Sequence, residues 1–385
     1  MLRKGKLKMI SSDKQLSRVL MISSYSYDGH HLRDLTHGFH LSGIEVGLIS
    51  LSNAPKPKWL ENGCGEDFSK PFAADLSLLR KIIWTVRLLR KFRPEVIQTH
   101  LFHGGIVGLI AGRITGVPVV HTRHHIDEHF QSGTPIHRFI DRIVAKRSDH
   151  VIVCSRAAKE WLIKMEGINP SQVTVINQGF DFSYLNPSNE EISESRKFLN
   201  LDSNKINIVC ISRYSKVKGQ NYLIDALEVL TKEIPNIFVT FIGPGDSTWL
   251  VELISELQLE KFVRVMASRS DVPACIAASD ILVHTSLADS FSVLLIEAQA
   301  VGGLVIATDI AAAREQIIEG ITGVIIPPRD SKSIAEAVRF LINNPGSAMS
   351  MRRNGPSHVR EKFTWQRMVR EEIECLTKYA RDTQT

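Results

Sequence analysis

The chain has 385 residues, 43% hydrophobic and 23% charged, with a net charge of +6, and this composition is that of a globular protein rather than a disordered one. Its basic N-terminus has no apolar core of a secretory signal, and no apolar run approaches the roughly 20 residues of a membrane span. The five cysteines lie far apart without a CxxC pair, which argues against a zinc ribbon or a redox pair and for a reducing compartment.

The first half of the sequence alternates short apolar runs with longer helical stretches, as in parallel α/β layers. Strands are expected at residues 18–23, 45–51, 95–100, 117–122 and 150–155. Helices are expected at residues 75–92, 103–115 and 135–147. A polar stretch at 181–205 follows, and its Ser, Asn and Pro content is typical of a linker.

The same alternation restarts after this stretch and predicts a second α/β domain of similar size. Strands are expected at residues 206–212, 237–243, 262–267, 281–286, 304–308 and 323–327. Helices are expected at residues 219–233, 247–257, 271–278 and 331–343. In open parallel sheets, ligands bind beyond the carboxyl ends of the strands, so two facing Rossmann-like sheets predict a ligand cleft between domains.

Two loops of the second half carry candidate binding residues. In ISRYSKVKG, Arg213 and Lys218 follow a predicted strand and precede a helix, and two cations beside a helix N-terminus favour a phosphate or diphosphate. Solvated surface cations are the alternative. In FIGPGDS, Gly243 ends a strand, but the pattern is not GxGxxG, which argues against a nicotinamide cofactor and leaves a plain turn as the alternative.

The stretch DSFSVLLIE contains two carboxylates that are too far apart to share a proton in either a helix or a strand. Asp289 is expected in a loop after a strand. Ser290 or Ser292 is expected to cap a helix that runs to about Val301 and ends at a glycine pair. Glu297 then lies in a helix among apolar neighbours, where a carboxylate requires a partner unless it is simply solvated.

Taken in order, the motifs S-R-x4-K-G, I-G-x-G, acid-x7-E with A-x-A-x-G, T-D, and G-x-T-G-x2-I-P-P-x-D resemble those of the retaining glycosyltransferases of the GT-B fold, family four. Four segments of the first half resemble that family's landmarks in the same order: PEVIQTHLFHGG, GVPVVHTRHH, DHVIVCSRAAKEWLI and VTVINQGFD. The resemblance extends over about residues 18–375. Each motif alone is weak, whereas the ordered set is specific.

This resemblance implies two facing Rossmann-like domains: residues 1–185 on the acceptor side, rejoined by a C-terminal helix at 364–385, and residues 186–363 on the nucleotide-sugar side. It implies transfer of a sugar from a nucleotide diphosphate sugar to an acceptor hydroxyl, with retention at the anomeric carbon. A sugar or lipid-linked acceptor, a role in cell-surface polysaccharide or glycolipid synthesis, and a cytoplasmic location are expected. No metal or other cofactor is expected, and no Asp-x-Asp metal motif occurs.

The family's residue roles carry over to matching positions. Arg213 and Lys218 match the basic pair that holds the donor diphosphate. Glu297 matches the acid that accepts hydrogen bonds from the ribose, and Asp289 matches the acid near the donor sugar. The further donor contacts implied are Gly29, Gly243, Phe291, Ser292 and Val293. The family usually has Glu in place of Asp289 and glycines near two of the serines, so the identity of the donor sugar is the feature most affected.

Histidines dominate the predicted chemistry of the first half, which holds 12 of the 14. His124, in the motif Thr-Arg-His, matches a family histidine at the donor sugar and is the catalytic candidate of this half. A metal is the alternative, because residues 125–129 have the form H-x-x-E-H. That motif requires a helix and a third ligand, whereas this one follows a strand in a polar loop, so a metal is disfavoured.

Two glycine patterns of the first half have different interpretations. Gly29 lies in the first loop, Asp28-Gly29-His30-His31, where the family usually has a glycine pair, and it is expected to bring the backbone close to a phosphate or an acceptor. His30 or His31 either contacts the acceptor or is an exposed loop histidine. The glycines at 104, 108 and 112 recur every four residues, which favours close helix packing over a ligand loop.

Residues 80–93, RKIIWTVRLLRKFR, hold six cations and no acid, and residues 1–185 carry 25 Lys and Arg against 16 Asp and Glu. One helical face is expected to pack on the sheet. The other carries Arg80, Arg87, Arg90 and Lys91 beside Ile83 and Trp84, and this suits an anionic membrane surface, with a solvated basic face as the alternative. Nucleic acid is disfavoured, because no nucleic-acid motif accompanies the charge.

Two other functions remain alternatives to transfer. A nucleotide-sugar epimerase of the same fold would need no acceptor. A non-catalytic nucleotide-sugar binder would hold the donor without turnover.

Overall fold

A computed structural model describes residues 15–24, 30–52, 59–60, 63–69, 76–124 and 134–382. The chain divides into two compact units. The N-terminal unit comprises Met1–Phe180 and Phe363–Thr385, and the C-terminal unit comprises Asp181–Lys362. The sequence places the boundary after residue 185, whereas the structure places it after Phe180. No helix in the described residues is long and apolar enough to cross a bilayer.

The N-terminal unit is built on a seven-stranded sheet in the order β3-β2-β1-β4-β5-β6-β7, with every neighbouring pair parallel. The strands are β1 (Arg18–Ser23), β2 (Glu45–Ser50), β3 (Glu66–Asp67), β4 (Val96–His100), β5 (Val119–Arg123), β6 (His150–Val153) and β7 (Val173–Val175). The central strands are buried along most of their length, as short apolar runs covered on both faces predict.

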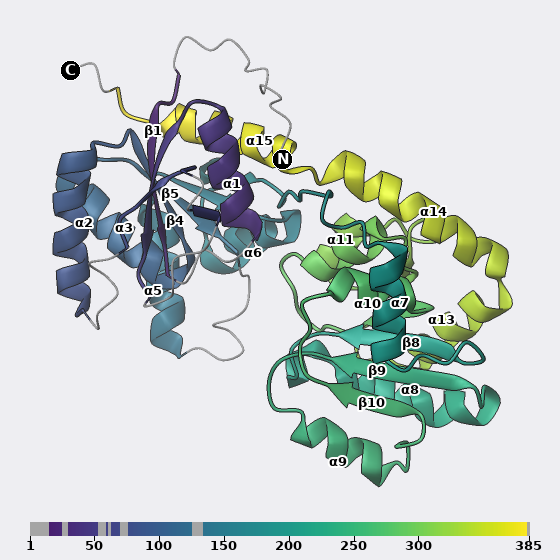
Figure 1. Cartoon of the computed structure of the whole chain (residues 1–385). Coiled ribbons are helices and arrows are strands. Elements are labelled where there is room, and N and C mark those ends of the chain that lie inside the picture. Colours follow the sequence, from purple (N-terminus) through teal and green to yellow (C-terminus); the bar gives the residue numbers. More distant parts are fainter. Residues whose placement is uncertain are drawn as a thin grey trace. The chain divides into compact units, whose positions relative to one another are not determined.

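The helices of this unit are α1 (His30–Leu41), α2 (Leu78–Phe92), α3 (Leu101–Thr115), α5 (Pro135–Arg147), α6 (Arg156–Glu166) and α15 (Trp365–Tyr379). A short 3-10 turn, η3 (Pro170–Gln172), precedes β7. Helix α3 packs against both α2 and α5, and Figure 1 shows the three labels on neighbouring ribbons.

The glycines of α3 permit close packing on the sheet, as the sequence favours. A Cβ atom at Gly104 would lie 2.7 Å from the carbonyl oxygen of Ile22, and one at Gly108 would lie 2.2 Å from a methyl group of Thr99. Neither separation is tolerated between real atoms, so these positions serve helix packing.

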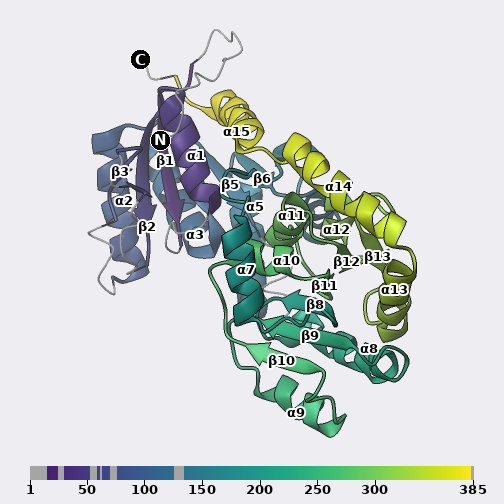
Figure 2. The ribbon, with the colours of Figure 1, turned by 45° about the vertical axis from the view of Figure 1, so that its right-hand side comes forward.

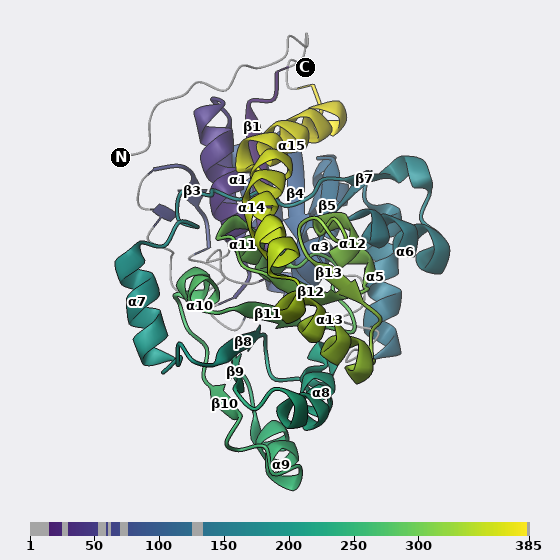
Figure 3. The same ribbon diagram turned by 90° about the vertical axis from the view of Figure 1, so that its right-hand side faces the viewer.

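Helix α15 completes the N-terminal unit from the far end of the sequence. It lies beside α1, as Figure 3 shows, and Met368, Val369 and Leu376 belong to the same buried core as β1 and β2. A Cβ atom at Gly38 of α1 would lie 2.3 Å from Val369, so the two helices approach each other closely at this point.

The C-terminal unit repeats the design with a six-stranded, all-parallel sheet in the order β10-β9-β8-β11-β12-β13. The strands are β8 (Ile206–Ile211), β9 (Ile237–Ile242), β10 (Val263–Met266), β11 (Ile281–His284), β12 (Val305–Thr308) and β13 (Val324–Ile326). Each corresponds to an apolar run that the sequence assigns to a strand. The confirmed fold is therefore the expected α/β fold with two parallel-sheet, Rossmann-like units.

The helices of the C-terminal unit are α7 (Asn189–Phe198), η4 (Lys216–Lys218), α8 (Gln220–Glu233), α9 (Thr248–Glu256), α10 (Val272–Ala278), α11 (Val293–Ala300), α12 (Ala311–Gln316), α13 (Ser331–Asn343) and α14 (Pro345–Lys362). Helices α8 and α13 lie side by side, as Figure 2 shows.

The interpretation of residues 181–205 as a linker is wrong, because this stretch contains α7. Ser188 accepts a hydrogen bond from the backbone of Glu191, and the Glu191 side chain accepts one from the backbone of Ser188. This reciprocal capping box satisfies helix N–H groups, and its Ser-x-x-Glu spacing is present in the sequence. The high content of polar residues obscured it.

Candidate functional site

Each sheet reverses its strand order at one point. In each unit, candidate residues lie at the carboxyl ends of strands beside that point. In the C-terminal unit the reversal lies between β8 and β11, and in the N-terminal unit between β1 and β4. Helices leave on opposite faces at such a point, which opens a crevice where α/β proteins bind ligands. Arg213 follows β8 and Asp289 follows β11, while His100 ends β4.

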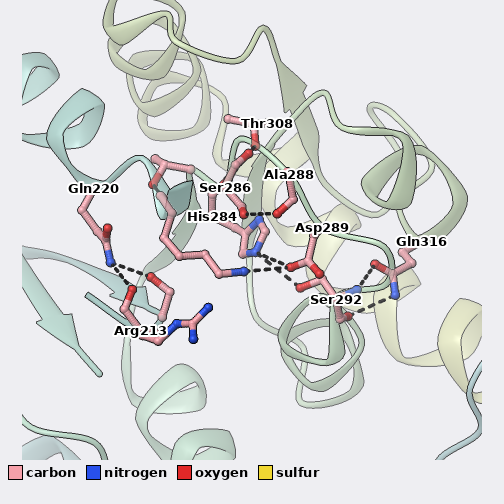
Figure 4. Close-up of polar contacts among 12 residues, drawn as sticks. Arg213, Gln220, His284, Ser286, Ala288, Asp289, Ser292, Thr308 and Gln316 are labelled. Atoms are coloured by element: carbon pink, nitrogen blue, oxygen red, sulfur yellow. Dashed lines mark hydrogen bonds and ion pairs between the residues drawn. The ribbon is translucent and has the colours of Figure 1, made fainter. Parts of the chain in front are cut away.

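The loop after β8 presents the two predicted cations differently. Arg213 is exposed, and its guanidinium makes no hydrogen bond or ion pair with the other residues drawn in Figure 4. Its backbone carbonyl accepts a hydrogen bond from Gln220, at 2.9 Å, and the same amide donates to the Ser212 hydroxyl at 2.8 Å. Gln220 thus fixes the loop backbone and leaves the Arg213 guanidinium available for an anion.

Lys218 and Asp289, which the resemblance assigns to diphosphate and sugar, form an ion pair. The Lys218 ammonium lies 3.1 Å from Oδ2 of Asp289, and each side chain is 20% exposed. The Thr285 hydroxyl donates to the Lys218 carbonyl at 2.7 Å, which ties the β8 loop to the β11 loop. A donor phosphate that approaches Lys218 therefore shares that cation with a carboxylate already in place.

His284, at the end of β11, lies behind this pair and was assigned no role from the sequence. Figure 4 shows His284, Asp289 and Ser292 pointing toward one another; Nε2 of His284 is 3.9 Å from the Asp289 carboxylate and 3.4 Å from the Ser292 hydroxyl. Burial lowers the pKa of His284 to about 4, although Asp289 opposes that change. The imidazole is therefore neutral near pH 7, and Lys218 is the charge partner of Asp289.

Helix α11 begins after Ser292, close to the predicted position, but Ser292 does not cap it with its side chain. Its hydroxyl lies beside His284 instead, and its backbone is held by Gln316. The Ser292 N–H donates to Oε1 of Gln316 at 3.2 Å, and the Gln316 amide donates to the Ser292 carbonyl at 3.0 Å. Ser292 is thus the N-cap residue, one of the two that the sequence offers, but its side chain gives no capping hydrogen bond to the N–H groups at the start of α11.

Phe291 and Val293 flank this helix start and remain predicted donor contacts. Phe291 is buried and Val293 is half-buried.

Glu297 lies one turn into α11 and is half-buried. Its side chain has no hydrogen-bond or ion-pair partner among the described residues. Burial raises its pKa from 4.5 to about 7. A carboxylate kept from water without a donor costs free energy until a ligand supplies hydrogen bonds.

Gly243, after β9, is required by packing. A Cβ atom there would lie 1.9 Å from the Ser212 carbonyl oxygen, so the ends of β8 and β9 can approach only with glycine at this position. Gly219 has φ +63°, and its Cβ would lie 2.3 Å from the Thr285 carbonyl oxygen. These contacts support the loops that carry Arg213 and Lys218, and a direct donor contact at Gly243 stays a prediction.

In the N-terminal unit, His124 follows β5 and lies in a cluster of histidines. Its Nε2 is 3.1 Å from Nδ1 of His100, and its Nδ1 is 3.5 Å from the Gln178 amide nitrogen. His31 of α1 packs edge-on against the His124 ring, with centroids 5.0 Å apart. Burial lowers the pKa of His31 to about 4 and that of His100 well below its usual value.

Other sequence predictions for this unit lie outside the described residues. These are Gly29 in the first loop and the H-x-x-E-H motif at 125–129. Sequence reasoning missed His100, His284 and Gln316. His100 and His284 each end a buried apolar strand, and that position was the available signal; Gln316 had none, because its partner is distant in the sequence.

Comparisons with known proteins match both halves of the chain. The family model Glycosyltransferase Family 4 matches residues 29–184, and Glycosyl transferases group 1 matches residues 191–358. The chain is 25% identical over 306 residues to the UDP-Gal:alpha-D-GlcNAc-diphosphoundecaprenol alpha-1,3-galactosyltransferase of Escherichia coli, covering 77% of this chain and 79% of the relative. It is 28% identical over 313 residues to a D-inositol 3-phosphate glycosyltransferase of Gordonia bronchialis, covering 76% and 67%.

A solved structure shares the fold. Anabaena HepE in complex with UDP-glucose has a TM-score of 0.79 and 24% identity, with coverage of 94% of this chain and 99% of HepE.

Proposed function

We propose, from the premise that this chain belongs to the group 1 glycosyltransferases of the GT-B fold, that its donor is a UDP-hexose and its acceptor a lipid-linked saccharide. The family's members transfer sugars from nucleotide sugars, and transfer to an acceptor hydroxyl is the activity of this enzyme class. UDP is favoured because HepE was solved with UDP-glucose and the E. coli relative is named for UDP-Gal. A lipid-linked acceptor is favoured because that relative acts on a diphosphoundecaprenol-linked sugar.

The donor proposal rests on two side chains of opposite charge beside the β8–β11 reversal, neither of which has a side-chain partner among the described residues. The Arg213 guanidinium is an unengaged cation suited to a diphosphate, and Glu297 is an unengaged carboxylate suited to two ribose hydroxyls. Arg213 lies in the loop after β8, and Glu297 lies in the helix that follows β11, the two strands between which the order reverses. A nucleoside diphosphate has the anionic end and the diol that these groups require.

Catalysis in this proposal consists of stabilising the departing diphosphate. Negative charge develops on the leaving phosphate as the glycosidic bond breaks, and preorganised cations and helix N–H groups stabilise it more than they stabilise the ground state. Arg213, Lys218 and the uncapped start of α11 are the groups that supply this. Retention follows, by family analogy, when the leaving phosphate assists the acceptor hydroxyl on the same face.

His124 and Asp289 are the proposed sugar contacts. Asp289 is held by Lys218 at 3.1 Å, and this fixes the direction of its free oxygen. The Thr-Arg-His motif supports His124 as a contact to the donor sugar.

The test is nucleotide release from a panel of nucleotide sugars, with and without lipid-linked acceptors. Release that depends on the acceptor is expected with UDP-hexoses. Arg213→Ala and Glu297→Ala should abolish most of it, whereas the exposed controls Arg353→Ala and Glu336→Ala should not. Isomerisation of the nucleotide sugar without acceptor would identify an epimerase instead, and tight binding without turnover would identify a binder.

We also propose that the outer face of α2, α3 and α5 docks on an anionic membrane, which places the enzyme peripherally at the cytoplasmic leaflet. Half of the large apolar side chains that are exposed in the described part of the chain lie on these three helices: Leu78, Leu79, Ile83, Trp84, Ile110, Ile114, Ile136, Phe139 and Ile143. The predicted inner face of α2 is confirmed, since Ile82, Val86, Leu89 and Phe92 are buried.

Charge on the same three helices favours an anionic lipid surface over another protein. The exposed cations are Arg80, Arg87, Arg90, Lys91, Arg113, Arg142, Lys146 and Arg147, and the one acid within these helices, Asp141, is buried beside Arg123. The Arg87 guanidinium lies 5.7 Å from the Trp84 ring centroid. Each cation near an anionic bilayer contributes about 1 kcal/mol, and aromatic and aliphatic side chains add insertion energy.

Cosedimentation with anionic and zwitterionic vesicles tests the surface. The expected result is salt-sensitive binding to anionic vesicles that Trp84→Ala with Arg87→Glu weakens at least about tenfold. A matched pair on the other unit, Phe340→Ala with Lys332→Glu, should leave it unchanged. Equal binding by both double variants would exclude α2 from the docking face.

A further inference from the structure

Three histidines converge at the strand-order reversal of the N-terminal unit, and each comes from a different element. His31 lies in the first turn of α1, His100 ends β4, and His124 follows β5. One ring nitrogen from each can be chosen so that all three lie within 4.8 Å of one another. Among the described residues, no other group of three or more His, Cys, Asp or Glu side chains brings its ligand atoms this close together.

The geometry is near that of a metal site. Ligands at about 2.05 Å from a tetrahedral zinc ion lie about 3.3 Å from each other. The closest pair here, Nδ1 of His100 and Nε2 of His124, is 3.1 Å apart. The remaining separations are at most 4.8 Å, so they exceed that value by no more than about 1.5 Å.

The cluster also contains unsatisfied nitrogen atoms. Both ring nitrogens of His31 and Nε2 of His100 are buried and lack a hydrogen-bond partner in the described structure. A buried polar atom without a partner is costly. An ion held by Nδ1 of His100 and Nε2 of His124 would satisfy one nitrogen of His31, whereas Nε2 of His100 would not be among its ligands. Among the three, His31 and His124 are only partly buried as whole residues.

We propose that His31, His100 and His124 form a binding site for a late transition metal ion such as Zn²⁺. Three neutral imidazoles are the ligand set of open zinc sites, with the fourth position left to water or another ligand. Mg²⁺ is excluded as the occupant, because it prefers oxygen ligands. The site modifies the expectation of no metal. An ion bound at Nε2 of His124 would occupy that atom, so the metal and the sugar contact proposed for His124 exclude each other there.

Gln178 is the outer partner of the site. Its amide lies 3.5 Å from Nδ1 of His124. When Nε2 of His124 binds the metal, Nδ1 carries the proton, and the Gln178 amide must present its oxygen to accept it. Partners of this kind orient a metal-binding histidine, and their loss costs roughly 10–100-fold in affinity.

Zn²⁺ alone is the probe, titrated by calorimetry into the full chain freed of any histidine tag, with the visible absorption of bound Co²⁺ as a second readout. Neither measurement needs a sugar donor, so the result does not depend on the proposed transferase activity. The variants are His31→Ala and His100→Ala, with His40→Ala on α1 and His103→Ala on α3 as matched controls at exposed positions. Thermal unfolding without metal establishes that each variant folds, and His100→Asn replaces His100→Ala if burial makes that variant unstable.

The expected result is one Zn²⁺ per chain, at least about tenfold weaker in each site variant and unchanged in both controls. Absence of saturable binding at one ion per chain would overturn the proposal. Full affinity in both site variants would do the same, because the ion would then be bound elsewhere. A fall in the two controls equal to that in the site variants would show adventitious surface binding and overturn it as well.

Discussion

Replacing Glu297 with Gln should stabilise the protein while weakening its hold on the nucleotide. Burial raises the pKa of this carboxyl from 4.5 to about 7, so the folded chain favours the protonated form. The wild type therefore loses stability as the pH rises from 4.5 to about 7, by up to about 1.4 kcal/mol per pH unit. The neutral amide avoids this loss, and the variant gains up to about 3 kcal/mol above pH 7.

Calorimetric unfolding at pH 5 and pH 8 measures the effect. One kcal/mol moves the Tm of a unit of this size by roughly 2–4 °C, so the variant should unfold roughly 6–12 °C higher at pH 8 and less than about 3 °C higher at pH 5. Glu336→Gln on the exposed face of α13 is the control and should show no such difference. An equal shift at both pH values, or a lower Tm at pH 8, would refute the reasoning.

The same substitution should weaken nucleotide binding, whereas it raises the stability of the fold. Ribose hydroxyls donate to the ionised carboxylate, so wild-type affinity for UDP should rise as the pH rises toward about 7 and then level off. Glu297→Gln should bind UDP more weakly at pH 8 and show little pH dependence. Isothermal titration at several pH values checks this, and a parallel rise in the variant would assign the titration to another group.

Three further predictions concern the same unit. Gly243→Ala should destabilise it by about 1–3 kcal/mol in denaturant unfolding, because the new methyl group meets the Ser212 carbonyl, whereas Gly346→Ala, with open space around it, should not. Arg213→Ala should weaken UDP binding by about 1.5–3 kcal/mol, and calorimetric titration at low salt measures it; unchanged affinity would remove Arg213 from the diphosphate site. Asp289→Glu should change the ratio of kcat/KM between two UDP-hexoses while leaving UDP affinity intact; an unchanged ratio would separate this carboxylate from sugar choice.

Strands were predicted better than helices, for a physical reason. A strand covered on both faces is a short apolar run, and β8 or β11 is recognisable from its residues alone. Helix α14 was missed because Pro356 and Gly355 lie within it, and these residues normally interrupt a helix. Helix α7 was missed because it is polar on most sides.

The candidate site was predicted in composition but not in pairing. The order of motifs placed Arg213 directly after a strand and Glu297 within a helix, where the structure has them. The ion pair between Lys218 and Asp289 joins residues 71 positions apart, and no local pattern encodes it. The same holds for His31 and His124, which come together only after β1, β4 and β5 have aligned.

The return of α15 to the N-terminal unit has a consequence for biosynthesis. Domains usually fold in the order in which the ribosome makes them. Here the C-terminal unit is complete at Lys362, whereas the N-terminal unit lacks Met368, Val369 and Leu376 of its core until α15 is synthesised. The unit that begins first is thus finished last, and the apolar core side chains that α15 covers stay uncovered until it is synthesised. Chaperone dependence during synthesis should accordingly track the α1–α15 contact, with Gly38 and Val369 at its centre.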